Sequence, residues 1–342
     1  MQDNKTTQPE SRSILNLSIV EHRDRLAAAK PMLNAADVPF FDMLLPVEDN
    51  VKIPVRIYIP KGKKGLFKTI FYIPGTAFIA SEIKFTHVIC SHLCEKSQCQ
   101  VIIINHRLAP ENQFPKGYQD AYNVFKYFMQ QMPENYLIEK DHVAIVGYSS
   151  GGNFAATMAL QARKEGIHVT QQVLVSPIVD LSRSLQGFEN YERQDKAISE
   201  EFINFFLKLY VPEKTDLKDP LLSPFWAKKE EVRTLPRTAI IFAEYDRFRS
   251  DAEYYYTKLK GENVPVERFV ADAENHAYLW YKLEVVDKIA EIVVTAFEPE
   301  SIRSLSPKHR IVDLVPVVSK NHPKKDDDEE ATHPTNGARS KL

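Results

Sequence analysis

Short apolar runs and longer amphipathic stretches alternate along most of the chain. The apolar runs are rich in Val, Ile and Phe and lie at residues 68–73, 101–105, 142–146, 173–176, 238–243 and 266–270. Such runs are typical of buried parallel strands. Apolar residues at helical spacing fill the stretches 87–96, 118–132, 153–164, 252–260 and 278–297. The alternation predicts an α/β fold, in which helices cover both faces of a mostly parallel sheet.

The region before this alternation has a different pattern. Residues 51–59 alternate between apolar and polar side chains, as expected for an antiparallel strand at the start of the sheet with one face in water. Pro54 lacks an amide proton for pairing, so we expect this strand near an edge.

Two segments do not fit the strand and helix alternation. One is a helical start at about residues 14–33, and the other is residues 181–229, which hold an amphipathic helix at 202–210. Ser199, followed by two glutamates, is a suitable N-cap for that helix. We predict that the two segments pack together as a helical cap, with a surface insertion without function as the alternative.

These patterns divide the chain into four parts. We expect an N-terminal helical cap segment at residues 1–45, a core made of residues 46–180 and 230–300, and a cap insertion at 181–229. Residues 307–342 are rich in charge, with a run of five acids at 326–330, and their composition predicts a disordered tail.

Composition and charge narrow the classes of partner. The shares of 44% hydrophobic and 26% charged residues are typical of a soluble globular protein. A net charge of -2 provides no electrostatic attraction for nucleic acid or an acidic membrane. No apolar run reaches the roughly 20 residues that span a bilayer. No secretion signal follows Met1. We therefore predict a cytoplasmic protein, without a membrane span, that acts on a small molecule. A homodimer and a monomer both remain open as its oligomeric state.

Two short features leave alternatives open. The chain ends in Ser340-Lys341-Leu342. In a eukaryote this tripeptide is a peroxisomal targeting signal, and the alternative is a chance match. Cys90, Cys94 and Cys99 crowd into one predicted helix. Because no His or acidic cluster completes a metal shell around them, buried packing is favoured over metal binding.

The segment most informative about chemistry is Gly147-Tyr148-Ser149-Ser150-Gly151-Gly152. It follows the strand at 142–146 and opens a helix rich in alanine. Glycine on either side of a serine, here at positions 147 and 151, suits a strained turn that exposes the serine hydroxyl above the sheet. A phosphate-binding glycine loop is disfavoured, because the lysine and the glycine spacing of those loops are absent. Ser149, central between the glycines, is the candidate nucleophile rather than Ser150.

A serine nucleophile needs a histidine base that a carboxylate orients, and in this fold they follow the serine in the order acid, histidine. Asp246 comes just after the strand at 238–243, and His276 comes after the strand at 266–270. Both positions lie at the carboxyl edge of the sheet, where active sites form. Asp251 is a competing acid, but its place at the start of a helix suits a capping role.

These residues resemble the hormone-sensitive-lipase group of α/β-hydrolases. The family's Gly-Asp-Ser-Ala-Gly-Gly turn is matched at residues 147–152, and its Asp-Tyr-Arg-Leu-Ala-Pro-Glu signature at 105–111, read here as Asn-His-Arg-Leu-Ala-Pro-Glu. Its Asp-Pro-Leu and His-Gly-Phe motifs correspond to Asp-Arg-Phe at 246–248 and His-Ala-Tyr at 276–278, and its Ser-Pro to 176–177. The resemblance spans residues 14–297 and implies the same three catalytic residues.

One departure from the family concerns the oxyanion hole. The family's His-Gly-Gly-Gly-Phe loop aligns with Pro74-Gly75-Thr76-Ala77-Phe78, so two glycines are lost. Because the hole uses main-chain donors, the amides of the segment Gly75, Thr76 and Ala77 can serve together with that of Ser150 if the loop keeps its conformation. Arg107 and Glu111 of the second signature are expected to brace the scaffold.

The resemblance favours hydrolysis of carboxylic esters with short to medium acyl chains, through an acyl-enzyme and without a metal or organic cofactor. An amidase or deacetylase with the same three residues is the first alternative. A catalytically impaired relative that acts as a binding protein is the second, because of the altered oxyanion loop.

Overall fold

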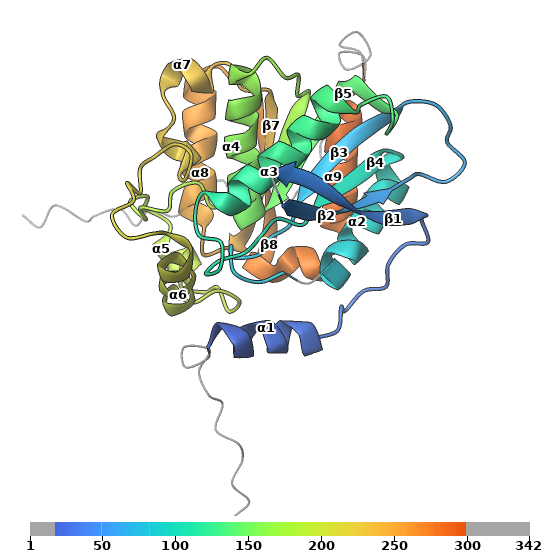
Figure 1. The fold of residues 1–342 in the computed structure, drawn as a ribbon. Coiled ribbons are helices and arrows are strands. Elements are labelled where there is room, and N and C mark those ends of the chain that lie inside the picture. The colour runs from blue at the N-terminus through green and yellow to red at the C-terminus, as the bar shows by residue number, and fades with distance from the viewer. Residues whose placement is uncertain (1–17, 49, 82, 299–342) are drawn as a thin grey trace, which may run out of the picture.

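The computed structural model describes residues 18–48, 50–81 and 83–298. The strands within these ranges are β1 (Phe40–Glu48), β2 (Val51–Tyr58), β3 (Phe67–Ile73), β4 (Gln100–Ile104), β5 (Ile138–Tyr148), β6 (Gln171–Val175), β7 (Arg237–Tyr245) and β8 (Val266–Asn275). They form one eight-stranded sheet in the order β1-β2-β4-β3-β5-β6-β7-β8 (Figure 1). β2 pairs antiparallel with both β1 and β4, and every later neighbour pairs parallel. The predicted α/β fold is confirmed.

Helices cover both faces of the sheet and bury a hydrophobic core on each. The covering helices are α2 (Ile83–Ser97), α3 (Lys116–Lys126), α4 (Ser150–Lys164), α8 (Arg249–Gly261) and α9 (Leu283–Ala296). α2 and α9 share one core, and α3, α4 and α8 share the other. Residues of β3 alternate between the two, with Phe71 and Ile73 on the α4 side and Ile70 and Tyr72 on the α2 side. Both faces are dry, which explains why the strands read as continuous apolar runs.

Most predicted elements match, with differences at their ends. The predicted helix at 118–132 finishes as a π-helical turn, η2 (Tyr127–Gln131). The predicted helix at 278–297 is split into a 3₁₀ turn, η4 (His276–Trp280), and α9. Cys90, Cys94 and Cys99 are buried free thiols, as the packing interpretation predicts.

β1 was not predicted from the sequence, so the predicted boundary of the N-terminal cap segment at residue 45 is wrong. Residues 40–45 already belong to the sheet, where β1 pairs with β2. The physical reason is that β1 is an edge strand whose side chains are mostly exposed, with Leu45 buried, so no apolar alternation marks it. Pro54 lies in β2, next to this edge.

The remaining helical elements are α1 (Ile19–Ala28), α5 (Glu189–Glu192), α6 (Glu200–Tyr210), η3 (Pro224–Trp226) and α7 (Lys229–Val232). α1 and α6 lie near one another on the same side of the sheet (Figure 1), and the rings of His22 and Phe202 are 5.1 Å apart. As predicted, Ser199 caps α6 by accepting a hydrogen bond from the amide of Phe202 at 3.2 Å.

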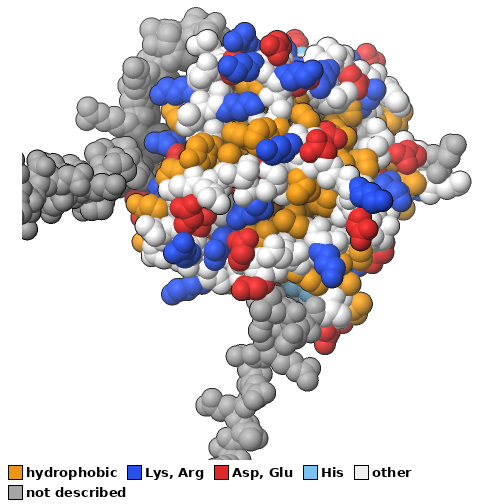
Figure 2. All heavy atoms as spheres, turned by 90° about the vertical axis from the view of Figure 1, so that its left-hand side faces the viewer, with side chains coloured by type: hydrophobic (Ala, Val, Ile, Leu, Met, Phe, Trp, Pro, Cys, Tyr) orange, Lys and Arg blue, Asp and Glu red, His pale blue; other side chains and the backbone are white. Residues whose placement is uncertain are grey.

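The distribution of surface charge and the character of the helices can be compared with the predictions on nucleic acid and membranes. Basic and acidic side chains are interspersed over the face seen in Figure 2, with hydrophobic side chains between them. Among the described residues, no helix has the length and apolar character needed to cross a bilayer. The predicted tail at 307–342, including Ser340-Lys341-Leu342, lies outside the described residues.

Candidate active site

Ser149 lies at a sharp turn between β5 and α4. Its φ and ψ of 55° and -119° are unusual for a residue with a side chain. The turn is possible because its glycines leave space: a Cβ on Gly151 would lie 2.1 Å from the Ile73 carbonyl oxygen, and one on Gly147 would lie 2.1 Å from the Gly151 carbonyl oxygen. The crowding explains why the sequence has glycine at both positions.

The three residues predicted from chain order lie together in the structure. His276 Nε2 is 2.8 Å from Ser149 Oγ, and His276 Nδ1 is 2.8 Å from Asp246 Oδ1. Asp246 follows β7 and His276 follows β8, so the carboxyl edge of the sheet positions both. All three side chains are buried, with exposed fractions of 7% for Ser149, 0% for Asp246 and 3% for His276. An unbroken hydrogen-bonded chain therefore runs from carboxylate to imidazole to hydroxyl.

The electrostatics of these three hydrogen-bonded side chains favour an ionised Asp246 carboxylate facing a basic His276 imidazole. Burial raises the pKa of Asp246, but the neighbouring His276 and hydrogen bonds from His276 and the Phe248 amide outweigh it, so the net pKa is lowered. Burial lowers the pKa of His276, but the charge of Asp246 and its hydrogen bond outweigh that effect, so the net pKa is raised. The imidazole is thus a stronger base than an ordinary histidine.

The loop predicted to supply oxyanion donors lies beside Ser149. Ala77 has a φ of 45°, in the left-handed region that favours glycine. The amide of Thr76 does not match the expectation of a free donor, because it donates to the Ser150 hydroxyl at 2.9 Å. The amides of Gly75, Ala77 and Ser150 donate no hydrogen bond to any group of the described residues.

A cavity of about 350 Å³ opens over Ser149 and His276. Its walls are mainly apolar and come from α1, the loop at residues 75–77, the segment before α6, α6 itself and η4. The lining residues are His22, Arg25, Leu26, Ala29, Gly75, Thr76, Ala77, Ala80, Tyr148, Ser149, Ala197, Ile198, Phe202, His276, Ala277 and Trp280. Both segments predicted as the cap thus contribute to the pocket that Ser149 lines.

Comparison with known proteins decides the family. A family model described as alpha/beta hydrolase fold matches residues 70–280. The chain is 32% identical over 240 residues to an arylesterase of Saccharolobus solfataricus, covering 70% of this chain and 76% of the relative. The chain belongs to the hormone-sensitive-lipase-like family of α/β-hydrolases. It is also 28% identical over 277 residues to the arylacetamide deacetylase of Bos taurus, covering 63% of this chain and 69% of that protein.

Solved structures extend this likeness over most of the fold. An ester hydrolase from the metagenome of Lake Arreo, solved with a phosphonate derivative, superposes with a TM-score of 0.75 at 27% identity. The match covers 84% of this chain and 93% of that one. This α/β-hydrolase therefore shares the architecture of an esterase over its sheet and covering helices.

The second family signature braces the scaffold, as predicted. Arg107 forms a two-point ion pair with the buried Asp120, with distances of 2.8 and 2.6 Å. Glu111 accepts two hydrogen bonds from Arg23, at 2.8 and 2.9 Å, and Arg23 also donates to the carbonyl groups of Ile79 and Ala109. Glu111 thereby anchors α1 above the pocket of this hydrolase.

The competing acid lies away from the histidine. Asp251 is within α8 rather than at its cap, and it accepts hydrogen bonds from the amides of Val179 and Asp180 at 2.7 and 2.9 Å. It therefore holds the segment that follows β6, and Asp246 is the acid bonded to His276.

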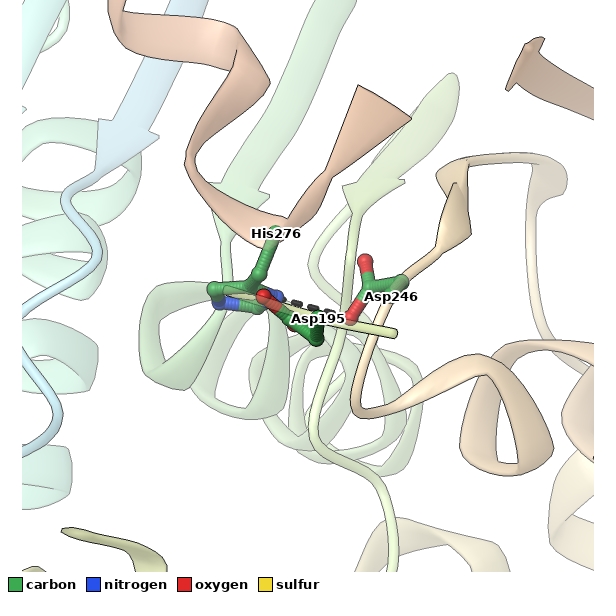
Figure 3. Close-up of side chains that lie close together, drawn as sticks. All are labelled: Asp195, Asp246 and His276. Carbon is green, nitrogen blue, oxygen red and sulfur yellow. Dashed lines mark hydrogen bonds and ion pairs between the residues drawn. The ribbon is translucent and has the colours of Figure 1, made fainter. Parts of the chain in front are cut away.

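Sequence reasoning missed two residues that contact the histidine region. Tyr148 donates a 2.6 Å hydrogen bond to the main-chain carbonyl of His276, and its ring stacks against the imidazole. Asp195 lies beside His276 and Asp246, although it comes from the segment between α5 and α6 (Figure 3). The family turn has an acid where this chain has Tyr148, so the substitution itself was a signal. No sequence pattern singles out Asp195.

Asp195, Asp246 and His276 also form a group of possible metal ligands, with one atom of each within 4.8 Å of the others. Both His276 nitrogens are engaged, by Asp246 and Ser149, and both Asp195 oxygens accept main-chain hydrogen bonds. A cation ligated here would have to break the hydrogen bonds that connect His276 to the serine and the acid. The arrangement fits nucleophilic hydrolysis better than metal binding.

Proposed function

We propose that this protein is a carboxylesterase in which Ser149 is the nucleophile, His276 the general base and Asp246 the acid that orients it. The observation that carries the proposal is the continuous chain of hydrogen bonds at the floor of the cavity, with 2.8 Å at each step. The similarity to an arylesterase supports the ester as the substrate class.

The first half of the reaction forms an acyl-enzyme. Ser149 Oγ attacks the ester carbonyl carbon while His276 Nε2 takes the hydroxyl proton, and Asp246 stabilises the imidazolium that results. We assign the oxyanion to the amides of Ala77 and Ser150, because the Thr76 amide is already engaged by the Ser150 hydroxyl. His276 then gives its proton to the leaving alcohol as the carbon–oxygen bond of the ester breaks.

The second half returns the enzyme to its starting state. A water molecule gives a proton to His276 and attacks the acyl carbon, and collapse of the second tetrahedral intermediate releases the carboxylic acid. The proton on His276 returns to Ser149 Oγ. The chain supplies every group that these steps require.

The shape of the cavity supports a short to medium acyl chain. Leu26 and Phe202 close the apolar cavity of about 350 Å³ from the side of α1 and α6. We propose that α1 and the 181–229 segment act as the cap that sets this limit.

An amide substrate is the second candidate. The similarity to arylacetamide deacetylase favours it, and the same three residues can act on an amide because only the leaving group differs. An aryl acetamide assayed beside the matching aryl acetate separates the two substrate classes.

The test is hydrolysis of p-nitrophenyl esters of rising acyl length by the protein and by a Ser149→Ala variant. Turnover in the wild type, with a loss of at least about a thousandfold in the variant, is expected. The matched control is Ser184→Ala, because Ser184 lies on the cap segment and donates to Asp180 instead of lining the pocket. Equal turnover in the wild type and Ser149→Ala contradicts the proposal.

A further inference from the structure

Asp195 is a buried carboxylate that the segment over the pocket places against the candidate catalytic residues. It lies between α5 and α6, and its exposed fraction is 7%. Figure 3 shows its side chain next to the His276 ring and on the same side as Asp246. One oxygen of Asp195 lies within 4.8 Å of ligand atoms of both His276 and Asp246.

Three main-chain amides hold this carboxylate in place. Its Oδ1 accepts from the amides of Ala197 and Ile198 at 2.8 and 3.2 Å, and its Oδ2 accepts from the amide of Arg247 at 2.8 Å. Ala197 and Ile198 line the pocket, and Arg247 directly follows Asp246. Asp195 therefore connects a wall of the pocket to the loop that carries the acid.

The surroundings of Asp195 contain one base and several other ionisable groups. His276 and Asp246 face it. Its charge raises the pKa of both Tyr148 and Tyr281. The side-chain Nε–H of Arg247 donates to the carbonyl of Ile198. The net pKa of Asp195 is raised, because burial and the charge of Asp246 raise it and His276 and the amide donors oppose the rise only in part. Amide donors favour the ionised carboxylate, and the histidine is the nearby group that becomes a cation.

We propose that Asp195 is a positioning residue for the hydrogen-bonded relay of Asp246, His276 and Ser149. It is a second carboxylate, supplied by the cap, that stabilises the His276 imidazolium. It also fixes the pocket wall relative to the loop that carries Asp246. This inference rests on the proposed function for its catalytic meaning. Asp195 takes no proton in the cycle: the proton still moves from Ser149 Oγ to His276 Nε2 and then to the leaving oxygen.

The sign of the effect follows from the charge. A negative group near His276 favours the protonated imidazole, so its removal lowers the pKa of His276. Because the free enzyme needs a neutral imidazole, the acid limb of the kcat/KM profile then moves to lower pH. At the same time the imidazolium of the transition state is less stabilised, so kcat falls.

The test is Asp195→Asn, which removes the charge and keeps the size of the side chain. Its one oxygen can still accept from the amides of Ala197 and Ile198, and the hydrogen bond from the Arg247 amide is lost. We expect the acid limb to move down by about one pH unit and kcat to fall about threefold to tenfold. An NMR titration of the His276 ring provides a readout independent of turnover, with its pKa lowered by a similar amount. Glu201→Gln is the control, since it removes one exposed carboxylate from α6 and is expected to leave both readouts unchanged.

Each outcome separates the inference from the proposed function. Unchanged His276 titration and an unchanged acid limb in Asp195→Asn overturn the role of Asp195, whatever the activity of the wild type. A wild type without hydrolase activity overturns the proposed function, and the NMR titration still decides the electrostatic role. If Asp195→Asn fails to fold, Asp195→Ser provides the same measurements, because a hydroxyl can still accept from the Ala197 amide.

Discussion

The main-chain amide of Thr76 donates a 2.9 Å hydrogen bond to the side-chain hydroxyl of Ser150. The Thr76 hydroxyl lies 3.2 Å from the same oxygen. In the family turn that residues 147–152 resemble, alanine stands at the position of Ser150 and has no hydroxyl to accept such a bond. Thr76 and Ser150, which both differ from the family motifs, therefore contact each other at the proposed oxyanion loop. Their contact engages the Thr76 amide, one of the donors expected from that loop.

Replacing Ser150 with alanine is expected to release the Thr76 amide. An oxyanion donor is worth about two to three orders of magnitude in turnover when fully aligned, so we predict an increase in kcat of about tenfold for partial recovery. Steady-state kinetics on one p-nitrophenyl ester measure it, with KM expected to change little. A fall in kcat would instead mean that the Ser150 hydroxyl itself assists the reaction.

The second prediction concerns the left-handed backbone conformation of Ala77. At a φ of 45° a β-branched side chain is strained, so Ala77→Val is expected to displace the amide and lower kcat about a hundredfold. Ala77→Gly is the matched control, because glycine adopts this conformation freely, and it is expected to retain kcat. Comparison of kcat for the two variants checks the assignment, and equal activity of the valine variant and the wild type would remove Ala77 from the hole.

The pH dependence follows from the raised pKa of His276. The Asp246 carboxylate favours the imidazolium, so the histidine loses its proton at a pH above the ordinary value of about 6.5. We predict that kcat/KM rises with pH through this raised pKa and then reaches a plateau. Asp246→Asn removes the charge and is expected to move the acid limb to lower pH. A wild-type limb centred below 6.5 contradicts this description of the site.

Phe202 is predicted to limit the acyl chain. It extends from α6 into the pocket, so Phe202→Ala creates space for extra methylene groups, each worth about 0.8 kcal/mol when buried. We expect the ratio of kcat/KM for a p-nitrophenyl octanoate to that for the acetate to rise about tenfold or more. Phe205→Ala is the control, because Phe205 lies on the same helix and stacks on Phe202 without lining the pocket.

The sequence predicted the positions of the catalytic candidates well, for a topological reason. Ser149, Asp246 and His276 each follow a parallel strand, and the carboxyl ends of neighbouring strands meet at one edge of a sheet. Strand runs and chain order were therefore sufficient to bring together residues as far as 127 positions apart. The glycine spacing indicated the turn, because a Cβ at Gly151 has no room.

What the sequence did not predict depends on irregular backbone or on exposed surface. β1 has few buried side chains, and its apolar residues do not alternate with polar ones, so no strand pattern marks it. Asp195 reaches the site through a segment between two helices, and its place is set by hydrogen bonds to amides that have no sequence signature. The engagement of Thr76 by Ser150 also required coordinates, since it depends on the angle of one turn.

The most direct test of the central claim is covalent labelling with a p-nitrophenyl alkylphosphonate, which a serine nucleophile attacks with release of p-nitrophenol. Peptide mass spectrometry then locates the phosphonyl group. The proposed relay predicts one adduct per chain, located on Ser149, with none formed in His276→Asn over the same time. An adduct on Ser150, or turnover of esters that persists when Ser149 is replaced by alanine, would contradict it.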